Sequence, residues 1–219
     1  MTERLAVSHR SPIRRSRGGG IIVDLDAVHA GAIGEAVEQT RDLLREDAPA
    51  VGVAPGHGPA DPSSEDELFA AIVADITAAG DGARPEDPVL HRLLPDASAD
   101  DEAATEFRAA TEAGLRRRKI AALDEVLADL QRMREGRGPV VVSPQRVRSW
   151  LTGVNDTRLA LGSVLQIGAD DDLMGELDDY LDDDVTNEGD GERTLRAYRI
   201  VVYDILTGML DKIVTVVSS

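Results

Sequence analysis

The C-terminal end of the chain carries an apolar pattern typical of a long helix that several neighbours bury. Its apolar residues recur every three or four positions, at Leu195, Tyr198, Val202, Ile205, Met209, Ile213 and Val216. Because 3.6 residues make one helical turn, these side chains share one stripe, which Leu206, Leu210 and Val217 widen. We therefore expect this helix at the centre of a helical bundle, packed against the helices that contain Trp150 and Ile120.

Two short apolar runs, far apart in the sequence, follow one plan of glycine, β-run, capping residue and helix. The first has Gly20, the run 21–25, Asp26 and a helix near 27–46, and the second has Gly138, the run 140–142, Ser143 and a helix from Pro144. We expect the two runs to pair, and the alternative is a chance likeness of two apolar segments. Since the chain has only six aromatic residues, aliphatic side chains must build the core. The predicted fold is mainly α, a helical bundle with a minor two-stranded β element.

The middle of the sequence indicates one short helix and one long helical region. Residues 88–94 predict a single helical turn between two prolines, and Asp100 or Asp101 begins the long region. Its first apolar stripe is Ala103, Phe107, Ala110 and Gly114, and its second is Ile120, Leu123, Leu127 and Leu130. Because Thr111 can cap the second segment, we expect a kink or a restart within 111–114.

Charge divides the chain into segments of different character. Residues 1–20 contain five arginines, one acid and a closing run of three glycines, which predicts a flexible basic arm. Residues 166–192 contain twelve acids and no Lys or Arg, so we expect a solvated acidic insert with one short helix over 173–181. The Ala-, Pro- and Gly-rich stretch 48–62 predicts a mobile loop. The rest of 21–219 is expected to be one helical regulatory domain.

The net charge and the amino-acid composition exclude several classes of function. A net charge of −17 opposes close approach of a broad surface to nucleic acid, so at most weak, non-specific DNA contact is expected. Arginines of the basic arm are the candidates for auxiliary phosphate contacts: Arg10, Arg14, Arg15 and Arg17. The absence of cysteine excludes disulfides and thiol-based sensing by this chain. The most apolar stretch, 199–217, is interrupted by Asp204, Asp211 and Lys212, so we expect no membrane span and a cytoplasmic protein.

No pattern in the sequence indicates catalysis, a metal or a cofactor. The four histidines lie apart, without a second ligand at a helical spacing that would hold a metal ion. A calcium loop starting at Asp184 fails because its twelfth position is Leu195, where a bidentate glutamate is needed. Nucleophile elbows, phosphate-binding loops and dinucleotide fingerprints are missing from the sequence as well. We therefore expect a protein that is not an enzyme.

Consecutive basic residues in the long helical region form the main candidate site. Residues 116–119 are all basic, and at 100° per residue they cannot share one face, so at least one must lie beside the apolar stripe. Such a side chain needs a carboxylate. The natural partners lie in the helix that contains Trp150, so the predicted polar network is Arg116, Arg118, Asn155, Asp156 and Arg158. A structural ion-pair network and a partner-binding patch both remain open. A helix-turn-helix over 143–165 is a weak match, because the segment reads as one continuous helix.

Three blocks of sequence carry a resemblance to a known family. They are DPVLHRLLPD at 87–96, EFRAATEAGLRRRK at 106–119 and WLTGVNDTRLALG at 150–162. The chain resembles an actinobacterial family of a domain of unknown function, usually encoded beside the ClpS adaptor and typified by AosR-like oxidative-stress transcription regulators. The resemblance covers most of 18–217 and leaves out the acidic insert.

The resemblance implies a non-enzymatic regulator of transcription in the stress response, working through contacts with a sigma factor or RNA polymerase, as a monomer or homodimer. The alternative is a proteostasis adaptor associated with ClpS and the Clp machinery. Redox sensing in AosR-type members is attributed to a cysteine pair near the N-terminus, and this chain has none. A thiol switch is therefore not expected here.

Overall fold

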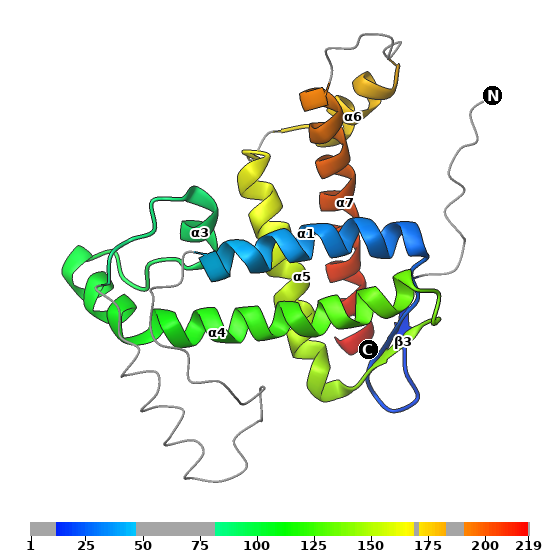
Figure 1. The fold of residues 1–219 in the computed structure, drawn as a ribbon, viewed down its shortest axis with the longest axis horizontal. Coiled ribbons are helices and arrows are strands. Elements are labelled where there is room, and N and C mark those ends of the chain that lie inside the picture. Colours follow the sequence, from blue (N-terminus) through cyan, green and yellow to red (C-terminus); the bar gives the residue numbers. More distant parts are fainter. Residues whose placement is uncertain (1–11, 47–81, 169–170, 183–190, 219) are drawn as a thin grey trace.

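The computed structural model describes residues 12–46, 82–168, 171–182 and 191–218, and within these ranges the protein has six helices and three strands (Figure 1). In chain order they are β1 (Ile13–Arg15), β2 (Ile21–Val23), α1 (Ala27–Glu46), α3 (Pro88–Leu93), α4 (Asp101–Arg134), β3 (Val140–Val142), α5 (Pro144–Val164), α6 (Leu173–Asp182) and α7 (Gly191–Ser218). The prediction of a mainly α fold is confirmed. The predicted loop 48–62 lies outside the described residues.

The three strands form one small antiparallel sheet in the order β1-β2-β3. Ile21 of β2 pairs with Val142 of β3, and Val23 pairs with Val140, which confirms the predicted pairing of the two distant runs. Helices leave both strands as expected. Asp26 accepts a hydrogen bond from the backbone N–H of His29 at 2.9 Å and so caps α1, and Ser143 stands at the N-cap of α5 before Pro144.

The sheet has a third strand, which corrects both the predicted two-stranded element and the arm predicted over residues 1–20. Ile13 of β1 pairs with Val23 and is only 1% exposed, and the Ser16 N–H donates to the Gly20 carbonyl at 2.8 Å to close the turn. Burial of this isoleucine under α7 fixes the strand, although the other two residues of β1 are arginines. The described part of the arm, from residue 12, is therefore ordered, and residues 1–11 lie outside the described ranges.

The helices pack in two crossing layers (Figure 1). α1 and α4 lie side by side in one layer, while α5 and α7 run across behind them. α5 contacts α4, α7, α3 and α1, so it occupies the middle, and the side chain of Trp150 is fully buried there. α7 packs on α5 as predicted. Its other main neighbours are β1 and α6, so the expected packing against the helix that contains Ile120 is wrong.

The long helix α4 runs without interruption from Asp101 to Arg134, so the predicted restart over 111–114 is wrong. The Thr111 hydroxyl does not cap a new segment. It donates to the Phe107 carbonyl one turn earlier at 2.8 Å, which a helix interior accommodates. The first predicted apolar stripe is also wrong, because Phe107 is 54% exposed and the buried side of this half-helix carries Ala104 and Arg108 instead.

The acidic region contains the short helix that its sequence predicts. α6 extends over Leu173–Asp182, one residue beyond the predicted 173–181, and lies beside the N-terminal end of α7 (Figure 1). Within the described ranges, no helix has the length and apolar character needed to cross a membrane.

Candidate functional site

The three blocks of sequence singled out above come together at the junction of α3, α4 and α5. Asp87 caps α3, accepting from the backbone N–H of Val89 at 2.6 Å and of Leu90 at 3.2 Å. This capped turn buries Leu93 and Leu94 against α5, and the chain then presents Asp96 to α4. Local helix signals in the first block thus position a carboxylate over the basic residues of the second.

A chain of buried charges follows from Asp96, and we call these four residues the arginine cluster: Asp96, Arg108, Glu112 and Arg116. Asp96 forms an ion pair with Arg108, and Glu112 lies 3.7 Å from Arg108 and 2.7 Å from Arg116. Arg116 is 3% exposed and donates through Nη1 to the Leu44 carbonyl in the last turn of α1 at 3.0 Å. The cluster therefore connects α3, α4 and the C-terminal end of α1, where backbone carbonyls lack helical partners.

Asp156 is buried, as predicted, but its partner is Lys119. The Nζ of Lys119 lies 2.6 Å from Oδ1 of Asp156, which is 2% exposed. The expected pairing of Asp156 with Arg116 or Arg118 is wrong, because Arg116 points toward α1 and Arg118 lies on the exposed side of α4. Burial raises the pKa of the Asp156 carboxyl above its ordinary value of 3.8, and the nearby Lys119 ammonium only partly offsets this effect.

Asn155 and Arg158, the other members of the predicted network, form a separate contact. Arg158 donates to Oδ1 of Asn155 at 3.3 Å and to the hydroxyl of Tyr203 on α7 at 3.2 Å. Its guanidinium also lies 5.8 Å from the centre of the Tyr203 ring. Arg158 therefore joins α5 to α7, and four of the five predicted residues divide among three separate contacts, while Arg118 lies on the exposed side of α4.

Sequence reasoning missed a further polar contact between α4 and α5. Arg146 donates through Nε to Glu125 at 3.0 Å and through Nη2 to Asp129 at 2.8 Å, while the indole N–H of Trp150 donates to Asp129 at 3.0 Å. A fully buried tryptophan requires an acceptor for its N–H. The acidic residues among the apolar positions of α4 were the signal that could have identified it.

Three of the four arginines proposed for phosphate contact lie on or directly after β1. Arg14 lies 3.9 Å from Asp24, Arg15 and Arg17 are exposed on and after β1, and Arg10 lies outside the described residues. Over the described ranges, no group of three or more His, Asp or Glu side chains could hold a metal ion.

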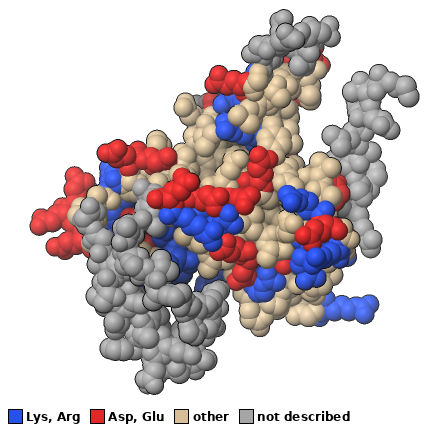
Figure 2. All heavy atoms as spheres, viewed as in Figure 1, with Lys and Arg blue, Asp and Glu red and all other residues tan. Residues whose placement is uncertain are grey.

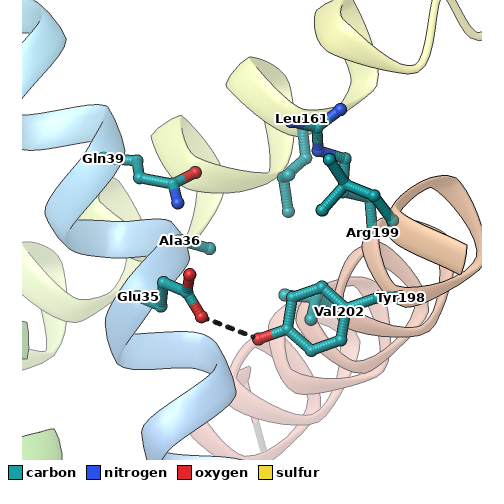
Figure 3. A pocket seen from close by; sticks show the side chains of 8 residues that line it. Glu35, Ala36, Gln39, Leu161, Tyr198, Arg199 and Val202 are labelled. Atoms are coloured by element: carbon teal, nitrogen blue, oxygen red, sulfur yellow. Dashed lines mark hydrogen bonds between the residues drawn. The ribbon is translucent and has the colours of Figure 1, made fainter. Parts of the chain in front are cut away.

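Two hollows lie along α1. The smaller, of about 40 Å³, has Ala36, Leu161 and Val202 at its apolar floor, and the Tyr198 hydroxyl donates to Glu35 at 3.2 Å at its edge (Figure 3). Burial, and then the neighbouring Glu35 carboxylate, raises the pKa of Tyr198. A space this size holds a few water molecules, far less than a cofactor.

The larger hollow is a groove of about 690 Å³ between α1 and α4. Small residues, among them Gly31, Gly34 and Ala128, form its floor, and charged side chains such as Glu38 and Arg134 form its rim. Acidic and basic side chains adjoin one another over α1 and α4 (Figure 2). The groove is open to solvent, and its rim carries side chains of both charges.

Comparison with known proteins gives a family for most of the chain. The model of the family described as "Domain of unknown function (DUF2017)" matches residues 10–217. The chain belongs to the DUF2017 family. A curated protein, "Putative oxidative stress regulator AosR" of Mycobacterium leprae (strain TN), is 35% identical to this chain over 103 residues.

That match covers 41% of this chain and 46% of the relative, so it spans less than half of the curated protein. No solved structure matches the chain. The family assignment thus covers nearly the whole DUF2017 chain, while the likeness to a named regulator covers only part of it.

Proposed function

We propose that this DUF2017 protein is a non-enzymatic regulator of transcription in the stress response and acts through contacts with a sigma factor or RNA polymerase. The printed name of its Mycobacterium leprae relative supports a regulatory role. The net charge of −17 supports recruitment by a protein rather than by DNA, because a phosphate backbone repels an acidic surface.

The observation that carries the protein-contact mechanism is the burial of α5. Residues 143–165 were the helix-turn-helix candidate, and a recognition helix needs a free face that can enter the major groove. α5 instead runs uninterrupted through the centre of the bundle, in contact with four other helices, with Trp150 and Val154 fully buried. Removing it from this position to read DNA would expose the core.

The regulator works without thiol switching, because the chain has no cysteine. A sulfenic acid or a disulfide cannot form on it, so mild peroxide has no thiol target. We expect its partner affinity to be the same before and after a peroxide dose that spares methionine.

The direct test is binding of the full-length protein to purified RNA polymerase core, to holoenzyme and to isolated sigma subunits from the same organism, measured by biolayer interferometry. We expect saturable binding to one of these components and an altered transcript yield from stress promoters in vitro. Binding to purified ClpS or a Clp ATPase, with none to any polymerase component, would contradict the proposal and favour the proteostasis adaptor.

A further inference from the structure

α6 is held on the outside of the protein by polar contacts. It lies beside the N-terminal end of α7, and none of its residues is buried (Figure 1). The guanidinium of Arg196 on α7 donates two hydrogen bonds to the Glu176 carboxylate, through Nε and through Nη2, the latter at 2.9 Å. The Tyr180 hydroxyl donates to Thr194 at 3.1 Å. These contacts fix the orientation of α6 without covering it.

The two sides of α6 differ in what covers their apolar residues. Leu173, Leu177 and Tyr180 are half-buried and share the side that faces α7. Met174 and Leu181 lie seven residues apart, which places them on one side two turns apart, and they are 43% and 66% exposed. The apolar stripe of α6 is therefore wider than α7 covers, and its uncovered part consists of two large side chains.

Acidic residues border this uncovered stripe along the side opposite α7. Asp178, Asp179 and Asp182 form no ion pair with any other described residue, and the sequence over 166–192 has no Lys or Arg to neutralise them. Ten residues are too few for a stable helix in water, and close like charges weaken it further. The chain nevertheless orients an apolar pair beside a row of acidic side chains. Such a face complements an apolar groove with a basic rim.

We propose that α6 is the docking element for the transcription partner, and that its Met174–Leu181 side enters an apolar groove bordered by Lys or Arg on the sigma factor or polymerase. The inference rests on the proposed function and adds to it the surface used and the chemistry of the partner. A helix placed in a groove by a few apolar anchors concentrates its binding energy in those anchors, while the acidic border sets the salt dependence.

Two pairs of variants test the face, each with a matched control elsewhere on the surface. Met174→Ser with Leu181→Ser removes the anchors, and Val28→Ser with Val214→Ser makes the same change at two other exposed residues. Asp178→Asn with Asp182→Asn removes acidic charges from α6, and Asp204→Asn with Asp211→Asn removes two exposed charges from α7. Unchanged Trp150 fluorescence and unfolding midpoint show that each variant folds.

Binding of all variants to the polymerase component that captures the wild-type protein is measured at two salt concentrations. We expect the anchor pair to raise Kd roughly tenfold or more, the α6 charge pair to weaken binding mainly at low salt, and both control pairs to change little. If the wild type binds and the α6 variants bind equally well, or the control pairs weaken binding as much, the docking role of α6 is wrong and the proposed function stands. If the wild-type protein binds no polymerase component, the proposed function fails and the docking inference fails with it.

Discussion

Lys119 Nζ on α4 lies 2.6 Å from Asp156 Oδ1 on α5, and this single contact joins two of the three sequence blocks that mark the family. The arginine cluster joins the remaining block to α4 through Asp96 and Arg108. The three blocks thus meet mainly through charge pairs between helices, which favours a structural ion-pair network over a partner-binding patch at this junction. Removing one member of a buried ion pair destabilises a protein far more than replacing both members by apolar residues.

Removing one partner of the Lys119–Asp156 pair should therefore cost more than replacing both. We expect Asp156→Ala to lower the free energy of unfolding by about 3 kcal/mol, because it strands the Lys119 ammonium in a largely buried position. Lys119→Met combined with Asp156→Leu should recover most of that loss. Urea unfolding followed by the fluorescence of Trp150, the single tryptophan, measures both. An Asp156→Ala midpoint equal to that of the wild type would show that the pair does not hold α4 to α5.

The raised pKa of Asp156 gives stability a specific pH dependence. Because burial raises this pKa above the ordinary 3.8, the native protein keeps the proton to a higher pH than the unfolded chain does. The contribution of this group to the free energy of unfolding is therefore complete below pH 3.8 and is lost as pH rises through the native value. Asp156→Asn removes it, so the stability of the wild type relative to this variant should fall from about pH 4 upward. A difference that rises over the same range would mean that Lys119 outweighs burial.

Two arginines, two positions apart on α4, should respond very differently to substitution. Arg116→Met leaves Glu112 and the Leu44 carbonyl without their donor, and we expect a loss of about 3 kcal/mol in stability. Arg118→Met, on the exposed side of the helix, should change stability by less than about 0.5 kcal/mol. Amide exchange at the C-terminal turn of α1 should accelerate only in the first variant. Equal effects of both substitutions would overturn the assignment of Arg116 as the connection to α1.

Gly20 and Gly18 offer a matched test of the N-terminal hairpin. A Cβ added at Gly20 would lie 2.0 Å from the Val142 carbonyl oxygen of β3, whereas one added at Gly18 meets nothing within 4 Å. We expect Gly20→Ala to cost about 3 kcal/mol, because the contact is with backbone that must shift, and Gly18→Ala to be nearly neutral. Equal midpoints for the two variants in thermal unfolding would show that β1 and its turn are not part of the cooperative fold.

The sequence predicted those features that local signals define. Asp26 caps α1 through its side chain and Pro144 stands at the first position of α5, two signals that act within one helical turn, and the pairing of β2 with β3 followed from two matching β-runs. The strand at Ile13 could not be predicted this way. The other two residues of this strand are arginines, so its sequence carries no apolar pattern. Pairing with β2 and packing under α7 give the strand its fixed conformation.

The candidate site was predicted only in part, for a related reason. Burial of Asp156 follows from the apolar pattern around it on α5, and the basic run 116–119 had to place one side chain next to the core. Which basic residue meets Asp156 depends on the rotation of α4 relative to α5 and α1, a tertiary quantity that spacing along one helix does not determine. The structure assigns Lys119 to Asp156 and Arg116 to Leu44.

The measurement that tests the central claim most directly is fluorescence anisotropy of labelled stress-promoter DNA, titrated with the protein alone and then in the presence of RNA polymerase holoenzyme. The account predicts weak binding by the protein alone, without sequence preference, that is lost as salt rises. It further predicts a promoter-specific complex containing the protein once the correct holoenzyme is added. Tight, salt-resistant and sequence-specific binding of promoter DNA by the isolated protein would contradict regulation through protein contacts.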